Sequence, residues 1–244
     1  MHRFFADPDR AETDCVYLAG DDARHAVTVL RLKPGNPVEI IRNGLLWEAE
    51  IISADTRDVR VRLLSPLPST EPALSVTLFQ GLPKADKMDL IVQKATELGI
   101  SRIVPVIMNR CVVRPDHGDF SRKTERWRKI IREAAKQSGR CVIPELTDPV
   151  PLQGLSGSFP LPECCAVPWE SAEKYGPLAF HNDHPRLSSF GVLIGPEGGI
   201  EQEEIRFLQS LSFIPVTLGR RILRTETAGL AAVSAFMSLY GEME

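Results

Sequence analysis

A small β-barrel domain followed by an α/β domain is the fold class that this sequence of 244 residues predicts. Short strand-like segments fill the first part of the chain, and apolar strands alternate with helices in the longer second part. Between them, Ser65–Pro72 holds three prolines in eight residues, which is typical of a stiff linker. We therefore expect domains at residues 1–70 and 73–244, with a mostly parallel sheet covered by helices in the second domain.

The composition is that of an ordinary globular protein, with 43% hydrophobic and 25% charged residues. A net charge of −3 gives no overall nucleic-acid footprint, so any contact with nucleic acid must come from local basic patches. The five cysteines form no CxxC or Cys/His ligand pattern, which indicates reduced thiols in a cytoplasmic protein. His181 and His184 with Asp183 lack a convincing third ligand, so no metal site is expected. Neither a signal peptide nor an apolar run of the about 18 residues that a membrane span needs is present.

The first domain is predicted from four short strands and one helix. Asn43-Gly44 is a hairpin turn signal between two of the strands, and the helix is expected over Asp21–Leu30, ahead of Lys33-Pro34-Gly35. Such a set of strands forms a small barrel or a sandwich. The predicted strands are Val16–Leu18, Val38–Arg42, Trp47–Ser53 and Val59–Leu64.

Strands and helices alternate after the linker, as in proteins with parallel sheets. Leu74–Gln80 is predicted to be a strand and Pro83–Leu98 a helix that Gly99 ends. Ile103–Ile107 and Glu163–Val167 are expected to be further strands.

The helix predicted over Ser121–Ser138 carries seven basic residues against Glu125 and Glu133. Its apolar side chains recur on one face, so this face packs and the others are strongly positive. The simplest interpretation is a solvated amphipathic helix with an i,i+4 pair between Glu125 and Lys129. A local excess of five positive charges in an acidic protein also fits a contact with nucleic acid.

A buried strand at Gly191–Ile194 leads into a sharp loop, Gly195-Pro196-Glu197-Gly198-Gly199. In α/β proteins ligands bind at the carboxyl ends of strands, and glycine lets a ligand approach the backbone. The loop nevertheless suits a neutral or cationic nucleoside-like ligand better than a nucleotide, because acidic residues crowd the next helix start and would repel a pyrophosphate. The alternative is that these residues form only a tight turn and a well-polarised helix start. The acidic residues are Glu197, Glu201, Glu203 and Glu204.

A second loop follows the strand predicted at Ile214–Leu218 and precedes a helix start at Thr225. It places Arg220, Arg221 and Arg224 within five residues. Such a cluster of guanidinium groups can pair with nucleic-acid phosphates or stabilise negative charge on a reacting base.

The final predicted helix, Thr225–Tyr240, contains no charged residue after Glu226 and is apolar nearly all round. Such a helix must be buried on several sides. Threading between neighbouring segments of the chain, a subunit interface, or both would bury it.

The two loop motifs resemble the SPOUT class of S-adenosylmethionine-dependent RNA methyltransferases, and more narrowly its RsmE family. They are Leu193–Gly199 and, further along, Leu218-Gly219 with Ile222–Ala228. The segments His25–Gly35 and Lys84–Gly99 resemble the same family, so the resemblance extends over essentially the whole chain. It implies S-adenosyl-L-methionine as cofactor and methylation of N3 of a uridine in 16S ribosomal RNA. It also implies a PUA-like RNA-binding barrel, a trefoil-knotted methyltransferase domain and a homodimer.

The resemblance assigns roles to residues of these motifs. Arg224 or Arg220 is expected to stabilise charge on the uracil oxygens, and Glu197 or Glu226 to orient the base or accept its proton. RNA contacts are expected from Arg24, Arg31, Lys84, Lys87, Arg126 and Arg140. The cofactor is expected to lie against Leu193, Ile194, Gly195, Pro196, Glu197, Gly198, Gly199, Leu218, Gly219, Ile222, Leu223, Arg224, Thr227 and Ala228.

Two other functions stay open at this point. A SPOUT enzyme that acts on another RNA, such as transfer RNA, would share the two loops, although the amino-terminal barrel favours ribosomal RNA. A non-catalytic RNA-binding factor of ribosome assembly would use the basic residues alone and would not bind S-adenosylmethionine.

Overall fold

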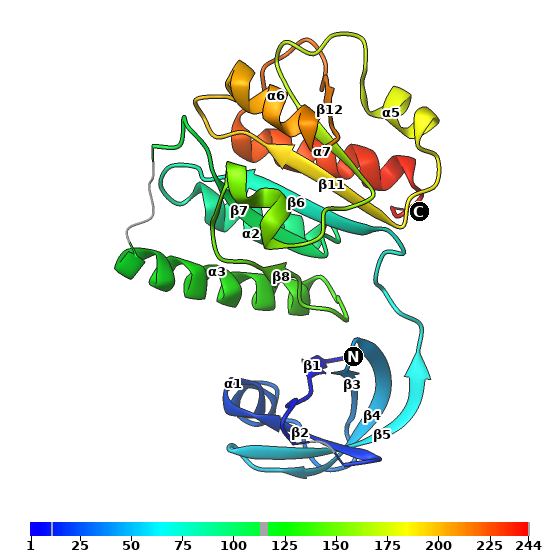
Figure 1. Cartoon of the computed structure of the whole chain (residues 1–244). Helices are drawn as coiled ribbons and strands as arrows, with labels where there is room; N and C mark the ends of the chain where they lie inside the picture. The colour runs from blue at the N-terminus through cyan, green and yellow to red at the C-terminus, as the bar shows by residue number, and fades with distance from the viewer. Residues whose placement is uncertain (11, 113–116, 244) are drawn as a thin grey trace. The chain divides into compact units, whose positions relative to one another are not determined.

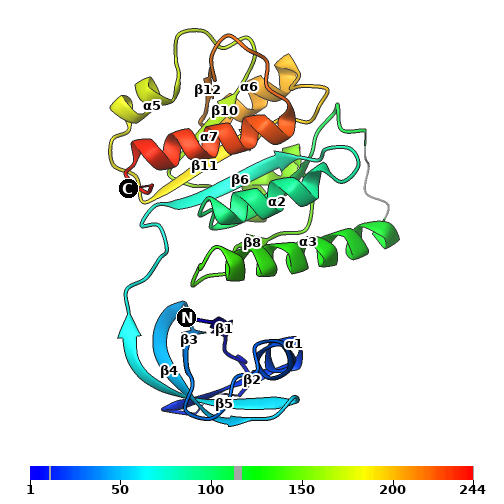
Figure 2. The same cartoon turned by 180° about the vertical axis from the view of Figure 1, so that it is seen from behind.

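The computed structural model describes residues 1–10, 12–112 and 117–243, and of residues 117–119 the backbone alone. The chain divides into two compact units. Unit 1 comprises Met1–Glu71 with Ala135–Val142, and unit 2 comprises Pro72–Ala134 with Ile143–Glu244. Each unit has its own sheet (Figure 1, Figure 2).

Unit 1 is built on a five-stranded sheet in the order β1-β3-β4-β5-β2, in which β1 is parallel to β3 and the other neighbours are antiparallel. Register shifts between β4 and β5 bend these long strands, as β-bulges do, and the sheet curls into a half-barrel (Figure 1). A backbone hydrogen bond of 2.8 Å from Asp7 N to Tyr17 O links the residues after β1 to β2. The strands are β1 (Arg3–Phe5), β2 (Cys15–Ala19), β3 (Pro37–Arg42), β4 (Leu45–Ala54) and β5 (Asp58–Leu67).

Alternate side chains of these strands point into the core of unit 1, where Val16, Leu18 and Ile40 are fully buried. The helix predicted at residues 21–30 is present as α1 (Gly20–Arg24), which runs directly into a π-helical turn, η1 (His25–Val29). This helical segment buries its alanines against the core and leaves its arginine in solvent.

Unit 2 contains a sheet in the order β12-β10-β11-β6-β7-β8, with β9 also paired to β7. All of the described pairs are parallel, which confirms the predicted parallel sheet. The middle strands β6 and β11 are apolar and almost completely buried, because helices cover both faces of the sheet. The strands are β6 (Ser75–Gly81), β7 (Arg102–Ile107), β8 (Glu145–Leu146), β9 (Val150–Pro151), β10 (Cys164–Pro168), β11 (Ser189–Ile194) and β12 (Phe213–Val216).

Two helices, α2 and α7, lie side by side on one face of this sheet (Figure 2). Helix α6 lies on the other face and packs beside β12 (Figure 1). The helices are α2 (Lys87–Glu97), α3 (His117–Gln137), η2 (Leu152–Gly154), α4 (Leu155–Ser158), α5 (Pro177–Asp183), α6 (Gln202–Ser210) and α7 (Thr225–Leu239).

Helix α2 begins at Lys87, four residues later than predicted. The residues before it form a loop in which Ala85 has a φ of 53°, a left-handed conformation that an α-helix excludes. The backbone N–H of Lys84 donates to the carboxylate of Glu197 at 3.0 Å instead of entering the helix. The prediction of a helix from Pro83 was therefore wrong, because a contact distant in sequence fixes this segment.

Helix α7 is confirmed as the last helix of the fold. Its inward face buries Ala232, Val233, Phe236 and Met237, and the ring centroid of Phe236 lies 4.4 Å from that of Phe190 in β11. The sequence predicted that this helix is buried on several sides. Within the single chain it is not, because other faces of α7 remain exposed or half-exposed. None of the described helices is long and apolar enough to cross a membrane.

Candidate functional site

Three loops emerge at the carboxyl edge of the unit 2 sheet, because the strands that precede them run parallel to one another in that sheet. Residues 82–86 follow β6, residues 195–201 follow β11, and residues 217–224 follow β12. The second of these is called the glycine loop below, and the third the arginine loop.

The glycine loop and the end of β6 approach each other at backbone distance. A Cβ atom added at Gly81 would lie 2.7 Å from the nitrogen of Pro196, and one added at Gly195 would lie 2.6 Å from Ile200. Gly199 has a φ of 76°, a conformation that favours glycine. The glycines of this region therefore permit close approach of chain segments and one left-handed turn.

A buried hydrogen-bond chain joins β6, the glycine loop and α7. The Gln80 side chain is fully buried, and its Nε2 donates to the Oγ1 of Thr225 at 2.9 Å. The Thr225 hydroxyl has one hydrogen, which it donates to the carbonyl of Gly195 at 2.6 Å, so it must accept from Gln80. The remaining Gln80 oxygen, Oε1, is buried and accepts no hydrogen bond from the described residues.

Lys87 lies between two carboxylates that come from different segments. Its Nζ is 2.9 Å from Glu197 in the glycine loop and 3.3 Å from Glu226 in the first turn of α7. The hydrogen bond to Glu197 is the main reason that the pKa of Lys87 is raised. Burial would raise the pKa of Glu197, but hydrogen bonds from Lys87 and from backbone N–H groups outweigh it, and the pKa is lowered. This Lys87 cluster carries a net charge of −1 and thus favours a cationic ligand nearby.

Asn109 and Arg110, which lie just after β7, connect this strand to the glycine loop and to the start of α6. Arg110 donates to the carbonyl of Gly198 at 2.9 Å and forms an ion pair with Glu201 at 3.3 Å. The Asn109 side chain donates to Glu201 at 2.9 Å, which is the main reason that the pKa of Glu201 is lowered. The Asn109 backbone donates to Glu204, which also closes a capping box with Glu201 at the start of α6. The acidic helix start thus anchors the glycine loop to β7.

The sequence analysis missed Gln80, Asn109 and Arg110. Each is a polar residue at or just beyond the carboxyl end of an apolar strand of a parallel sheet. That position was the available signal, because such residues face the edge where ligands bind.

The arginine loop has few internal contacts. Gly219 has a φ of 100°, and its N–H bonds to the hydroxyl of Thr217. Arg220, Arg221 and Arg224 are exposed, and within the described part of the chain none of them forms an ion pair. The large apolar side chain of Ile222 lies among them and is 84% exposed.

The structure brings the two predicted cofactor loops together. Thr225, the first residue after the arginine loop, touches the first residue of the glycine loop through the Thr225–Gly195 bond. Leu193 and Ile194 are buried in β11, so they offer a ligand their backbone at the strand end rather than an exposed side chain. Leu218, Leu223 and Ala228 are half-buried, and Thr227 is exposed on α7.

The six residues predicted to contact RNA differ in how they are held. In unit 1, Arg140 is only 5% exposed and pairs with Glu71, whereas Arg24 and Arg31 are exposed. In unit 2, Lys87 belongs to the cluster described above, and Arg126 pairs with Asp86 and Asp89. The remaining residue, Lys84, is exposed and uses its backbone to bind Glu197.

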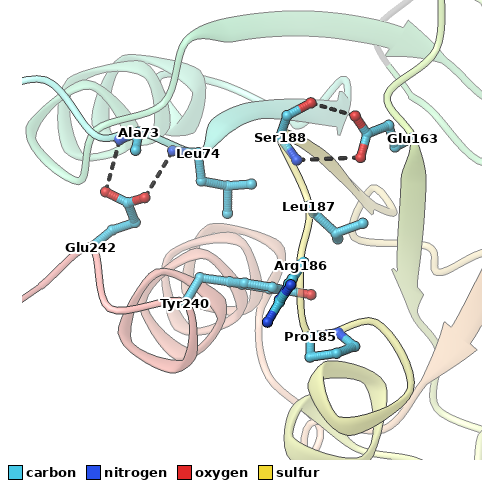
Figure 3. A pocket seen from close by; sticks show the side chains of 9 residues that line it. All are labelled: Ala73, Leu74, Glu163, Pro185, Arg186, Leu187, Ser188, Tyr240 and Glu242. Atoms are coloured by element: carbon cyan, nitrogen blue, oxygen red, sulfur yellow. Dashed lines mark hydrogen bonds between the residues drawn. The ribbon is translucent and has the colours of Figure 1, made fainter.

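A pocket of about 610 Å³ lies at the opposite, amino edge of the unit 2 sheet (Figure 3). Its two acidic side chains are occupied by local bonds: Glu242 accepts the backbone N–H groups of Ala73 and Leu74, and Glu163 binds Ser188. These contacts tie chain segments together, so both carboxylates stabilise the local fold. Among the described residues, no set of His, Cys, Asp or Glu side chains is arranged to hold a metal ion.

Two family models match the chain. Residues 70–237 match a model described as an RNA methyltransferase domain, and residues 18–64 match an RNA methyltransferase PUA domain. The ribosomal RNA small subunit methyltransferase E of Bacillus subtilis is 33% identical over 244 residues, which cover 96% of this chain and 95% of that protein. Its counterpart in Aquifex aeolicus is 30% identical over 98% of this chain and 100% of that protein.

Solved structures give the same similarity in three dimensions. The ribosomal RNA small subunit methyltransferase E of Neisseria gonorrhoeae, bound to S-adenosyl methionine, is 29% identical, with a TM-score of 0.85 over 98% of both chains. A methyltransferase from Legionella pneumophila in complex with the same cofactor is 30% identical, with a TM-score of 0.81 over 97% of this chain and 96% of that one.

Proposed function

Because the chain belongs to the RNA methyltransferase family whose model spans residues 70–237, we propose that it transfers the methyl group of S-adenosylmethionine to N3 of a uridine in small-subunit ribosomal RNA. The named relatives support ribosomal RNA as the substrate, and the solved relatives that contain S-adenosyl methionine support the cofactor.

The observation that carries this proposal is the convergence of the glycine loop, the end of β6 and the start of α7 at one edge of the sheet. The Gln80–Thr225–Gly195 chain holds these segments together. The fully buried Oε1 atom of Gln80 accepts no hydrogen bond from the described residues. Unsatisfied buried acceptors are costly, so they favour a ligand that brings hydrogen-bond donors.

The residues present fit S-adenosylmethionine. Backbone groups of residues 193–199 and 218–224 and the half-buried side chains beside them would hold its nucleoside part. The negative Lys87 cluster would favour its positive charges over the phosphates of a nucleotide. When bound, S-adenosylmethionine supplies an electrophilic methyl carbon on a positively charged sulfur.

The chemistry at uracil N3 requires a proton acceptor and a group that stabilises negative charge. The imide proton must leave before or during attack, and charge then accumulates on the two flanking oxygens. Arg224 or Arg220 is the proposed stabiliser, because each is exposed at this edge and unpaired within the described part of the chain. A carboxylate of the Lys87 cluster, Glu197 or Glu226, is the proposed acceptor.

The same proposal covers the rest of the molecule. Residues 1–70 would form a PUA-like RNA-binding barrel, a role that the curled sheet and the match of residues 18–64 support. Residues 73–244 would form the catalytic domain, with a trefoil-knotted path as the family resemblance implies. The partly uncovered, apolar α7 supports a homodimer. A cytoplasmic location follows from ribosomal RNA as the substrate.

The experiment is to incubate the protein with S-adenosylmethionine and ribosomal RNA that lacks the modification, and to map methylated nucleosides by mass spectrometry. One N3-methyluridine in small-subunit RNA is the expected product. Methylation of transfer RNA instead would move the substrate to another RNA. Absence of S-adenosylmethionine binding in calorimetry at millimolar concentration would favour a non-catalytic RNA-binding assembly factor.

A further inference from the structure

The two carboxylates of the Lys87 cluster are held in different ways. Both oxygens of Glu197 lie within hydrogen-bond distance of the Lys84 backbone N–H, at 3.0 and 3.3 Å, and Oε1 is also 2.9 Å from Lys87 Nζ. The pKa of Glu197 is lowered by these donors, although burial acts in the opposite direction. A carboxylate so firmly held in its ionised form is an anchor for the loop and a weak proton acceptor.

The carboxylate of Glu226 has fewer donors around it than that of Glu197. Its Oε2 lies 3.3 Å from Lys87 Nζ, a longer contact than the 2.9 Å between Lys87 and Glu197, and no backbone N–H of the described residues donates to it. The residue follows Thr225 directly, so the hydrogen-bond chain through Gln80 fixes its backbone at the start of α7. An ionised oxygen with a free lone pair is suited to receive an N–H donor such as the imide of uracil.

We propose that Glu226 accepts the proton that leaves the imide nitrogen of the substrate base, and that Lys87 is a positioning residue that holds this carboxylate in place. The inference rests on the proposed transfer of a methyl group to uracil N3. The N–H bond breaks as its proton passes to Glu226, and the nitrogen electron pair forms the bond to the methyl carbon. The electron pair of the broken carbon–sulfur bond returns to sulfur, which becomes neutral, and Glu226 later releases its proton to water.

The charged groups around Lys87 support this assignment. Glu197 and Glu226 are the groups that act on its ammonium. The acidic residues at the start of its own helix, Asp86 and Asp89, pair with Arg126 instead. Lys87 therefore pairs with the two carboxylates of the site. We infer a positioning role for it in place of the RNA contact that the sequence predicted.

The test is single-turnover methyl transfer from S-adenosylmethionine to unmodified small-subunit ribosomal RNA. Glu226→Gln is expected to lower the rate at saturating cofactor by at least about 10²-fold, the usual scale for loss of a general base, and to weaken cofactor binding no more than Glu197→Gln does, because each substitution removes one negative charge from the Lys87 cluster. Glu197→Gln is expected to weaken cofactor binding and, at saturating cofactor, to lower the rate by less than Glu226→Gln does. Lys87→Met is expected to lower the rate at saturating cofactor, because Glu226 loses the ammonium group that holds it, and Lys87→Arg should restore the rate.

Lys94→Met is the matched control, since Lys94 lies on the same helix and pairs with Glu97 away from the site. The inference is overturned if Glu197→Gln abolishes the rate while Glu226→Gln preserves it, or if Lys87→Met keeps the wild-type rate at saturating cofactor. If a thermal melt shows that Glu226→Gln is unfolded, Glu226→Asp provides the test. This variant keeps the negative charge but moves it back by one methylene, away from the substrate base. A wild-type protein that transfers no methyl group contradicts the proposed function itself, whereas an active wild type with an active Glu226→Gln overturns this inference alone.

Discussion

The glycine loop and the arginine loop lie at the same edge of one sheet, but they differ in how much of their structure the chain itself supplies. Side chains from three other elements hold the glycine loop: Lys87 from α2, Arg110 after β7 and Thr225 from α7. The arginine loop has a hydrogen bond between Gly219 and Thr217, and its large side chains extend into solvent.

This difference indicates a division of labour within the site. A loop fixed in advance binds a ligand without a further ordering cost. A loop with exposed cationic and apolar side chains makes its contacts only when a partner arrives. We therefore expect substitutions in the glycine loop to change folding and cofactor affinity, and substitutions in the arginine loop to change the reaction and RNA binding.

The largest effect is expected from Arg224→Ala. Loss of a hydrogen-bond donor at a developing charge lowers the rate by about 10²–10³-fold, and an exposed arginine without an ion pair contributes little to stability. Single-turnover rates and thermal melts measure the two quantities. Arg206→Ala, an exposed arginine on α6, is the control. An unchanged rate in Arg224→Ala would remove this residue from the proposed chemistry.

The next effect sharpens the contrast from the side of the glycine loop. Gly81→Ala places a Cβ 2.7 Å from the backbone nitrogen of Pro196, which cannot move aside as a flexible side chain can. Overpacking of this kind costs about 1–3 kcal/mol in the free energy of unfolding, and we expect cofactor affinity to fall with it. Gly157→Ala, where a Cβ would meet no atom within 4 Å, serves as the control in denaturant titrations. Equal stability of the two variants would contradict the close contact.

Thr225→Val tests the buried hydrogen-bond chain between the loops. The substitution removes the hydroxyl that accepts from the buried Gln80 side chain and donates to the half-buried carbonyl of Gly195. Unsatisfied buried groups cost about 1–3 kcal/mol, which chemical denaturation can measure. Thr28→Val, at an exposed hydroxyl in η1, should change stability by less than about 0.5 kcal/mol. A silent Thr225→Val would show that the chain does not tie the segments together.

The smallest effect concerns the pH dependence of stability. The pKa of Glu197 is lowered below its ordinary value of 4.5, so its stabilising contribution is present above that pH and is lost as pH falls through the lowered pKa. Glu197→Gln should therefore be less stable than wild type at neutral pH, and the difference should narrow below pH 4.5. Thermal melts across this range measure it, and a gap that widens on acidification would contradict the assignment.

The sequence predicted the fold well where local patterns decide it. Apolar strands between turn signals gave β6, β7, β10 and β11 to within a residue or two, and the apolar final helix was found as α7. The start of α2 was missed because the Lys84 N–H bonds to Glu197, which lies more than a hundred residues away. No local propensity contains such a contact.

The candidate site was predicted as two loops, but not as a network. The sequence motifs predicted that Gly195 and Arg224 belong to one site. Gln80 and Arg110 are assigned to the site only by their contacts in the structure. Lys87 was predicted to bind RNA as a basic residue of a helix whose motif resembles the family, and the structure pairs it with two carboxylates. Side-chain roles of this kind depend on which segments meet in space, and a single sequence does not record that.

Hydrogen–deuterium exchange with and without S-adenosylmethionine tests the central claim most directly. The account predicts that the amides of residues 217–224 gain the larger protection on binding, while those of residues 195–201 are already protected in the free protein. Protection confined to the pocket at the amino edge of the sheet, or no change in either loop, would contradict it.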